Sequence, residues 1–212
     1  MTDILEQYHY FVSPVYTIKK PEFLDVVRQA SNDSLSIARK NTKINDVYPI
    51  LQVDMLSDER MRPFFDYVIN TAWNLLNDQG YAMDGLSTYF TEGWCQEHHK
   101  TSSMESHHHS DSQLVAFYFT ECPKDSPRIV IHDPRSTKAM VSLPQQDTTN
   151  ITLATSIVNF VPEAGTLMFA NAWLPHSITR NPSTKPFKFI HMNIATRPYV
   201  GQAVYENTAD VI

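Results

Sequence analysis

Alternating apolar and polar residues fill the second half of the chain, and this pattern limits the fold more than any other feature. From residue 86 onward, short segments rich in β-branched and aromatic residues are separated by Pro, Asp, Ser or Asn. They are "LSTYFTEGW", "QLVAFYFT", "RIVIH", "KAMVSL", "NITLATSIVNF", "GTLMFAN" and "FKFIHMNIA". Such segments are typical of β-strands. The segment "YPILQV" at residues 48–53 is an earlier candidate.

Two stretches with helical periodicity precede these strands. Residues 21–40 begin with Pro21, which suits a first helical position, and Asn32-Asp33 are candidates to interrupt this helix. Residues 57–79 run from a Ser-Asp cap to Gly80. Seven or eight strands after two helices predict a mainly β protein with N-terminal helices and a double-stranded β-helix core, of the jelly-roll or cupin-like type. We expect one domain over residues 1–212, helical at about 20–80 and β at about 86–196.

Charge and cysteine content narrow the functional classes. The formal net charge is −6 and the pI is near 5.8, so the sequence gives no signal for nucleic acid or an anionic membrane as a partner. An apolar run of about 18 residues and a signal-peptide pattern are both missing, which predicts a soluble, cytoplasmic protein. Cys95 and Cys122 are expected to be free thiols. A small molecule or a peptide is the expected substrate, and a homodimer is one option for the assembly.

The stretch "SHHHSDSQ" at residues 106–113 is the main candidate for chemistry. Because side chains alternate along a strand, His107 and His109 share one face and His108 points to the other. His176 follows "GTLMFANAWLP", whose end would place it at the mouth of a barrel. Two close histidines and one distant histidine form a three-ligand metal site with open positions, to which Asp111 is an alternative carboxylate ligand.

The other histidines favour structural interpretations. His98 and His99 lie in a polar run that is typical of a surface loop, and His132 and His191 are interpreted as packing residues within strands. Arg135 is assigned equally to a turn or to the lining of the site.

Two blocks of the sequence resemble a branch of the iron(II)/2-oxoglutarate-dependent oxygenase superfamily. The branch is found in bacteria and phages and carries His-x-His, as does this chain. The shared motifs are His107-x-His109 with Ser112, Asp133-Pro134-Arg135, Gly165 to Phe169, Trp173-Leu174-Pro175-His176, and Asn193. The resemblance implies a double-stranded β-helix dioxygenase that binds iron(II) through His107, His109 and His176 and uses 2-oxoglutarate to hydroxylate its substrate.

The resemblance also implies residues that bind 2-oxoglutarate. The superfamily places Arg or Lys on the strand after the distal histidine, where this chain has Lys185 and Lys188. We predict that Lys188 pairs with the far carboxylate, and Asn193 and Tyr118 complete the predicted cosubstrate site. If Asn193 faces the site, however, regular alternation turns Lys188 outward and leaves Lys185, in the turn, as the alternative.

Two further hypotheses belong to other functional classes. One is a cupin-type metalloenzyme with three histidines that does not use 2-oxoglutarate, for which the two lysines would be dispensable. The other is a non-catalytic jelly-roll protein, with a binding or structural role, whose histidines hold zinc or no metal.

Overall fold

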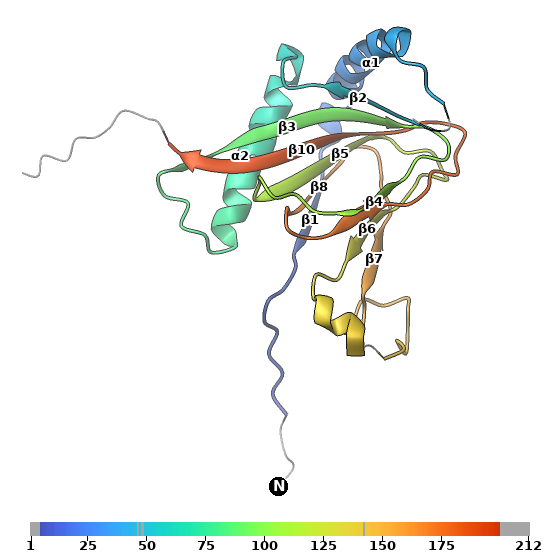
Figure 1. Ribbon diagram of the computed structural model, residues 1–212. Coiled ribbons are helices and arrows are strands. Elements are labelled where there is room, and N and C mark those ends of the chain that lie inside the picture. Colours follow the sequence, from blue (N-terminus) through green and yellow to red (C-terminus); the bar gives the residue numbers. More distant parts are fainter. Residues whose placement is uncertain (1–4, 46, 48, 142, 200–212) are drawn as a thin grey trace, which may run out of the picture.

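A computed structural model describes residues 5–45, 47, 49–141 and 143–199 of the chain (Figure 1). Mainly β structure and two N-terminal helices are present, as predicted. In chain order the elements are β1 (Val15–Lys19), η1 (Pro21–Phe23), α1 (Leu24–Asn41), β2 (Ile50–Asp54), η2 (Glu59–Met61), α2 (Arg62–Asp78), β3 (Leu86–His98), β4 (Met104–His107), β5 (Leu114–Glu121), β6 (Ile129–His132), η3 (Ser136–Val141), β7 (Ile157–Phe160), β8 (Thr166–Asn171), β9 (His176–Ile178) and β10 (Phe187–Pro198). The elements labelled η are short 3-10 helices.

The strands form two sheets. The larger sheet has the order β1-β8-β5-β10-β3-β2 and the smaller has the order β4-β9-β6-β7. All pairings are antiparallel. Strands that neighbour each other in a sheet are far apart in sequence, which is how a jelly roll brings distant residues together.

Both helices cover one face of the larger sheet. Apolar side chains of the two helices pack against alternate residues of the sheet and form one buried cluster with them. The sheet residues include Ala116 and Tyr118 of β5, and Ile190 and Met192 of β10. Phe64 of α2 packs on Tyr118, with ring centroids 4.8 Å apart. Burying one such aromatic side chain stabilises the fold by about 1.5–3 kcal/mol, so this face holds the helices firmly. We call it the helix face.

The opposite face of the larger sheet meets the smaller sheet, and we call it the inner face. The residues of this face alternate along each strand with those of the helix face, and they form a second apolar cluster that is rich in phenylalanine. It contains Val115, Phe117 and Phe119 of β5, and Phe187 and Phe189 of β10. Ile129 and Ile178 add side chains from the smaller sheet. A continuous β5 or β10 strand therefore sends odd-numbered residues inward and even-numbered residues toward the helices.

Several predicted boundaries are corrected. Helix α1 runs without a break through Asn32 and Asp33, whose side chains face outward and accept hydrogen bonds from Lys188 and Arg60. The predicted strand "KAMVSL" is wrong at residues 138–141, which belong to η3 and expose Met140 and Val141 instead of pairing in a sheet. Within "NITLATSIVNF" only residues 157–160 are a strand. Strand β2 begins at residue 50, and Tyr48 lies outside the described residues.

Two further predictions concern the cysteines and membranes. Cys95 and Cys122 are free thiols, as predicted. Among the helices of the described part of the chain, none has the length and apolarity needed to cross a membrane.

Candidate metal centre

Three histidines converge in the smaller sheet, where the last residue of β4 pairs with the first residue of β9. His107 is the last residue of β4, His176 is the first residue of β9, and the two residues pair directly across the ladder. His109 lies just beyond β4, and its backbone N–H donates to the carbonyl of Ala172 at 2.9 Å. One ring nitrogen from each of the three histidines lies within 4.8 Å of the others. The structure thus brings together the three histidines that were predicted to share a site.

Backbone carbonyls fix the proton positions on two of these rings. Nδ1 of His107 lies 2.7 Å from the carbonyl of Glu105, and Nδ1 of His176 lies 3.0 Å from that of Leu174. Because a carbonyl only accepts, each Nδ1 carries the proton and donates, which leaves the lone pair of Nε2 free. Such partners orient metal-binding histidines.

The remaining nitrogens fit a metal ion. Nε2 of His109 and Nε2 of His176 are buried and have no hydrogen-bond partner among the described residues. Burial lowers the pKa of both imidazoles to about 4, so both rings are neutral at pH 7. A neutral imidazole is the form that binds a metal. If these three imidazoles held an iron(II) ion, they would leave further coordination positions for other ligands.

Asp111 lies outside this cluster. Its carboxylate is exposed and accepts a hydrogen bond from the hydroxyl of Ser110 at 3.3 Å. Among the described residues, the group that can hold one metal ion consists of the three histidines alone. The geometry thus supports three imidazoles rather than two imidazoles and the carboxylate of Asp111.

A buried histidine lies behind the cluster on the inner face. The ring of His191 is 5.2 Å from that of His109 and 5.2 Å from that of Phe117. On its other side it stacks on Trp94, at 5.6 Å. His191 was interpreted from the sequence as a packing residue, and its position is consistent with that interpretation. Burial keeps its pKa well below the ordinary value, so it adds no charge behind the metal.

His98 is a correction to the predicted surface loop. Strand β3 continues to this residue, which is fully buried on the inner face between Phe187 and Phe189. Its Nε2 contacts the amide oxygen of Gln96 at 3.1 Å, and its Nδ1 has no partner among the described residues. The sequence pattern predicts too early an end for this strand, because Gln96 and His98 are polar and so do not look like buried strand residues.

The burial of His98 predicts acid sensitivity. Its pKa falls from 6.5 to about 4, because burial disfavours the charged ring and the charge of His99 adds to this. Between pH 6.5 and about pH 4 the imidazole of His98 is protonated in the unfolded chain but not in the folded chain. The free energy of unfolding is therefore highest above pH 6.5 and decreases as the pH falls below that value. The loss approaches about 3 kcal/mol below both pKa values. Urea unfolding from about pH 7 to pH 5 should show a shallower pH dependence for His98→Gln than for the wild type. An identical slope would contradict the assignment.

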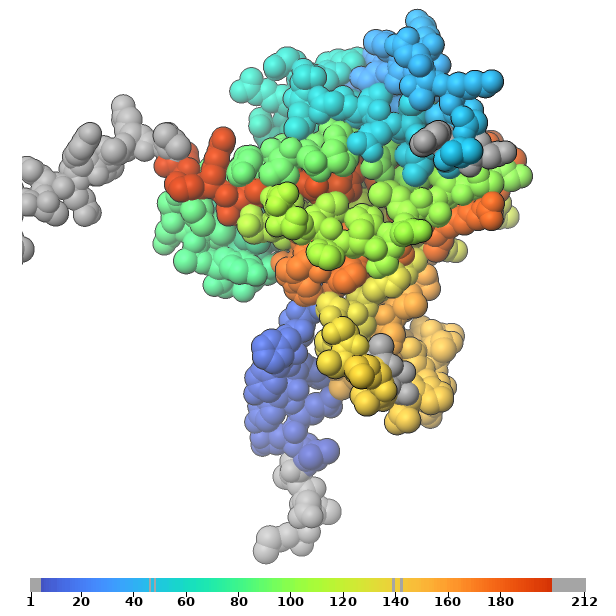
Figure 2. All heavy atoms as spheres, in the orientation of Figure 1, coloured from blue at the N-terminus to red at the C-terminus, as the bar shows by residue number. Residues whose placement is uncertain are grey.

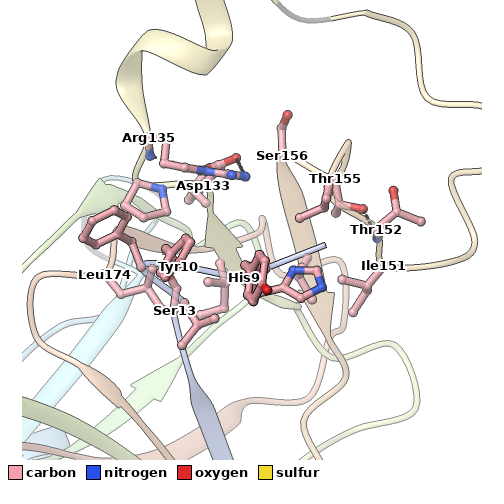
Figure 3. Close-up of a pocket in the computed structure, with 18 residues that line it drawn as sticks. His9, Tyr10, Ser13, Asp133, Arg135, Ile151, Thr152, Thr155, Ser156 and Leu174 are labelled. Carbon is pink, nitrogen blue, oxygen red and sulfur yellow. Dashed lines mark hydrogen bonds and ion pairs between the residues drawn. The ribbon is translucent and has the colours of Figure 1, made fainter. Parts of the chain in front are cut away.

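A cavity of about 670 Å³ near the smaller sheet lies beside the centre rather than at it, since none of the three histidines lines it (Figure 3). His9 and Tyr10 line it together with Ile151, Thr155 and Ser156 (Figure 3). Leu174, which also lines it, precedes His176 by two residues. The N-terminal segment and the segment around η3 project from the same side of the molecule (Figure 2). Arg135 lines this cavity, where Asp133 accepts its hydrogen bonds at 2.9 and 2.8 Å.

Residues 92–187 match the family model described as "Putative 2OG-Fe(II) oxygenase". The matched region contains all three histidines of the cluster. Over this stretch, a little under half of its length, the chain is similar to the 2OG-Fe(II) oxygenases. The description of this family model names iron(II) and 2-oxoglutarate, which are the two predicted cofactors. Among curated proteins, no sequence matches the chain.

Solved structures agree with the oxygenase fold. One similar structure is a 2OG-Fe(II) oxygenase family oxidoreductase from Burkholderia pseudomallei, with a TM-score of 0.52 and 10% identity over 85% of this chain and 84% of that chain. A Pseudomonas putida prolyl-4-hydroxylase has a TM-score of 0.56 and 12% identity over 87% and 94%. HygX from Streptomyces hygroscopicus, with nickel, 2-oxoglutarate and hygromycin B bound, has a TM-score of 0.54 and 13% identity over 89% and 84%. These likenesses confirm the predicted double-stranded β-helix fold.

The structure does not place Lys188 or Tyr118 at the candidate metal centre. Lys188 lies on the helix face, where its Nζ is 3.3 Å from Glu97 and 3.0 Å from Asn32. Tyr118 lies on the same face and donates its hydroxyl proton to the carbonyl of Lys20 at 2.8 Å. The physical reason is the alternation of side chains along a strand. Asn193 faces the centre, and Lys188 lies an odd number of residues away on the same unbroken strand, so its side chain points to the opposite face.

Lys185 does not replace Lys188 in the structure. It is exposed in the turn before β10 and lies beside Arg28 and Glu121, near the end of the helix face. Between residues 187 and 193 of β10, all of which are described, the inward positions hold Phe187, Phe189, His191 and Asn193. The metal therefore fits, whereas this stretch of the inner face offers the far carboxylate of 2-oxoglutarate no lysine or arginine.

Proposed function

We propose that this oxygenase hydroxylates an organic substrate at an iron(II) ion bound by His107, His109 and His176, with 2-oxoglutarate as cosubstrate. The observation that supports this proposal most strongly is the convergence of three ring nitrogens within 4.8 Å. Three neutral imidazoles leave the full charge of iron(II) in place. Dianionic 2-oxoglutarate would neutralise that charge, so the ligand set suits this cosubstrate electrostatically.

The chain's own residues hold and shield the centre. When bound, iron(II) and 2-oxoglutarate activate dioxygen and supply the oxidising power for hydroxylation of a C–H bond. The carbonyls of Glu105 and Leu174 hold the rings of His107 and His176 in the orientation that presents Nε2. Behind the centre, Phe117 packs edge-on against His176, with centroids 5.5 Å apart, and keeps water from that side.

An anaerobic titration tests the proposed function. Iron(II) and then 2-oxoglutarate are added to protein purified without a histidine tag, and the charge-transfer absorption of a bidentate complex is followed. We expect this absorption, and succinate from 2-oxoglutarate once air is admitted. Iron binding without either signal would contradict the proposal and place the chain among three-histidine metalloenzymes that do not use 2-oxoglutarate. No binding of iron would favour a non-catalytic jelly-roll protein.

A further inference from the structure

Another cavity, of about 290 Å³, adjoins the candidate metal centre at His109. His109 forms part of its wall, together with Glu92 of β3, Asn193 of β10 and the loop residues Asp111 and Ser112. Unlike the large cavity at the side, it therefore includes one of the three histidines of the cluster. A molecule in this cavity lies next to a metal ligand, which is where a substrate has to lie.

A β-bulge turns Glu92 toward this cavity. Along β3, Asn193 of β10 pairs with Glu92 and the next residue, Ile194, pairs with Phe90, so Thr91 is the extra residue. Phe90 packs on Phe65 of α2 with ring centroids 5.1 Å apart, on the helix face. Without the extra residue, Glu92 would share that face. Bulges of this kind redirect side chains and are common beside functional sites.

The polar groups of the cavity are only partly satisfied. Nδ2 of Asn193 donates to Oε2 of Glu92 at 2.6 Å, but its Oδ1 is buried and has no hydrogen-bond partner among the described residues. Asn193 as a whole is only 5% exposed. The hydroxyl of Ser112 is also buried and lacks a partner in the described part of the chain. A buried acceptor without a donor is costly, so the cavity is built for a ligand that brings donors.

The charge of the cavity defines the ligand further. Glu92 and Asp111 are its two carboxylates, and no lysine or arginine is among the described residues that line it. A dianion such as 2-oxoglutarate is repelled here. An ammonium group carries three N–H donors and one positive charge, and it finds acceptors in Glu92, Asn193 Oδ1 and Asp111.

We propose that this cavity binds a primary ammonium group of the substrate, so that the enzyme acts on an aliphatic amine. The inference rests on the proposed function in one respect, since it takes the histidine centre as the place of reaction. The ammonium group is held by Glu92 and Asn193, and the adjoining alkyl chain extends past His109 toward the metal. Asp111, which is exposed, contributes less than Glu92 because solvent screens its charge.

Calorimetric titration of the full chain loaded with zinc, which does not turn over, tests this inference. The probes are butylammonium, butanol and butyrate, which share a size and differ in charge. We expect butylammonium to bind tightest and butyrate weakest. Glu92→Gln should weaken butylammonium binding by about 10- to 100-fold, the loss of one charge-assisted hydrogen bond. Asp111→Asn should have a smaller effect. Asp125→Asn is the matched control, because Asp125 is exposed in the loop between β5 and β6.

Several results would overturn the inference. Binding of butyrate or butanol that equals or exceeds that of butylammonium rules out an ammonium site. An unchanged affinity of Glu92→Gln for butylammonium rules it out as well. Zinc affinity is measured on each variant by competition with a chelator. If Glu92→Gln loses zinc as strongly as His109→Ala does, the carboxylate serves the metal and not an amine. Amine binding needs no turnover, so it can hold even if no succinate is formed, and the two proposals fail separately.

Discussion

His176→Ala is expected to abolish tight iron(II) binding, and His107→Ala and His109→Ala should do the same. Each change removes one of the three ring nitrogens that lie within 4.8 Å of one another. Loss of a residue that merely supports a ligand typically costs 10- to 100-fold in metal affinity, so loss of a ligand should cost more than about 100-fold. Affinity is measured anaerobically, by competition with a coloured chelator, on protein without a histidine tag.

His108→Ala provides the matched control for these three variants. This histidine is the middle residue of the same triplet, but it is not part of the metal-binding group. It lines the smaller cavity instead. We expect it to retain most of the iron affinity of the wild type. Equal losses in all four variants would show that the metal is not held by this group.

Lys188→Ala is expected to lower the free energy of unfolding by about 2 kcal/mol and to leave the requirement for 2-oxoglutarate unchanged. Glu97 is fully buried, and Lys188 is one of its three partners, with Arg39 and His99. Burial acts to raise the pKa of Glu97, but the hydrogen bond from Arg39 and the charge of Lys188 together hold it below the ordinary value. Removing one partner of a buried carboxylate costs up to 3–5 kcal/mol, and the two remaining partners reduce that loss.

Two measurements check this expectation. Urea unfolding at pH 7 gives the stability, and succinate formation at varied 2-oxoglutarate gives the cosubstrate requirement. Because the pKa of Glu97 is lowered on folding, the contribution of Lys188 is present near neutral pH and is lost as the pH falls through that pKa. Lys185→Ala is the control: the residue is exposed, and a change within about 0.5 kcal/mol is expected. A raised cosubstrate requirement with unchanged stability would place Lys188 at the active site.

Regular periodicity made the layers of the fold predictable from sequence. Residues 114–119 of "QLVAFYFT" and residues 187–194 of "FKFIHMNIA" follow the alternation, and the phenylalanines of β5 and β10 meet between the sheets. The stretch "KAMVSL" is also rich in apolar residues, but residues 136–141 form the 3-10 helix η3. Pairing between strands is a tertiary property, and a short segment does not contain it.

The metal centre was easier to predict than its surroundings. Three histidines stand out by type and spacing, and the ladder between β4 and β9 places His107 opposite His176. Glu92 carried no such signal, since its direction depends on the bulge at Thr91, which the alternation in "LSTYFTEGW" does not reveal. Lys188 was assigned by analogy with the superfamily. The alternation of side chains along the strand predicts that Lys188 and Asn193 point to opposite faces of the sheet. In the structure Lys188 does lie on the helix face, beside Glu97.

The stack of Trp94 on His191 gives the protein a built-in optical reporter. The indole and imidazole planes are only 14° apart, and His191 in turn contacts the ring of His109. The two other tryptophans have different surroundings, since Trp73 donates to the carbonyl of Leu86 and Trp173 is 45% exposed. A transition-metal ion bound by His109 quenches a nearby excited indole, so the emission of Trp94 follows metal loading without any label. The rate of iron uptake and release thereby becomes measurable in a stopped-flow fluorimeter.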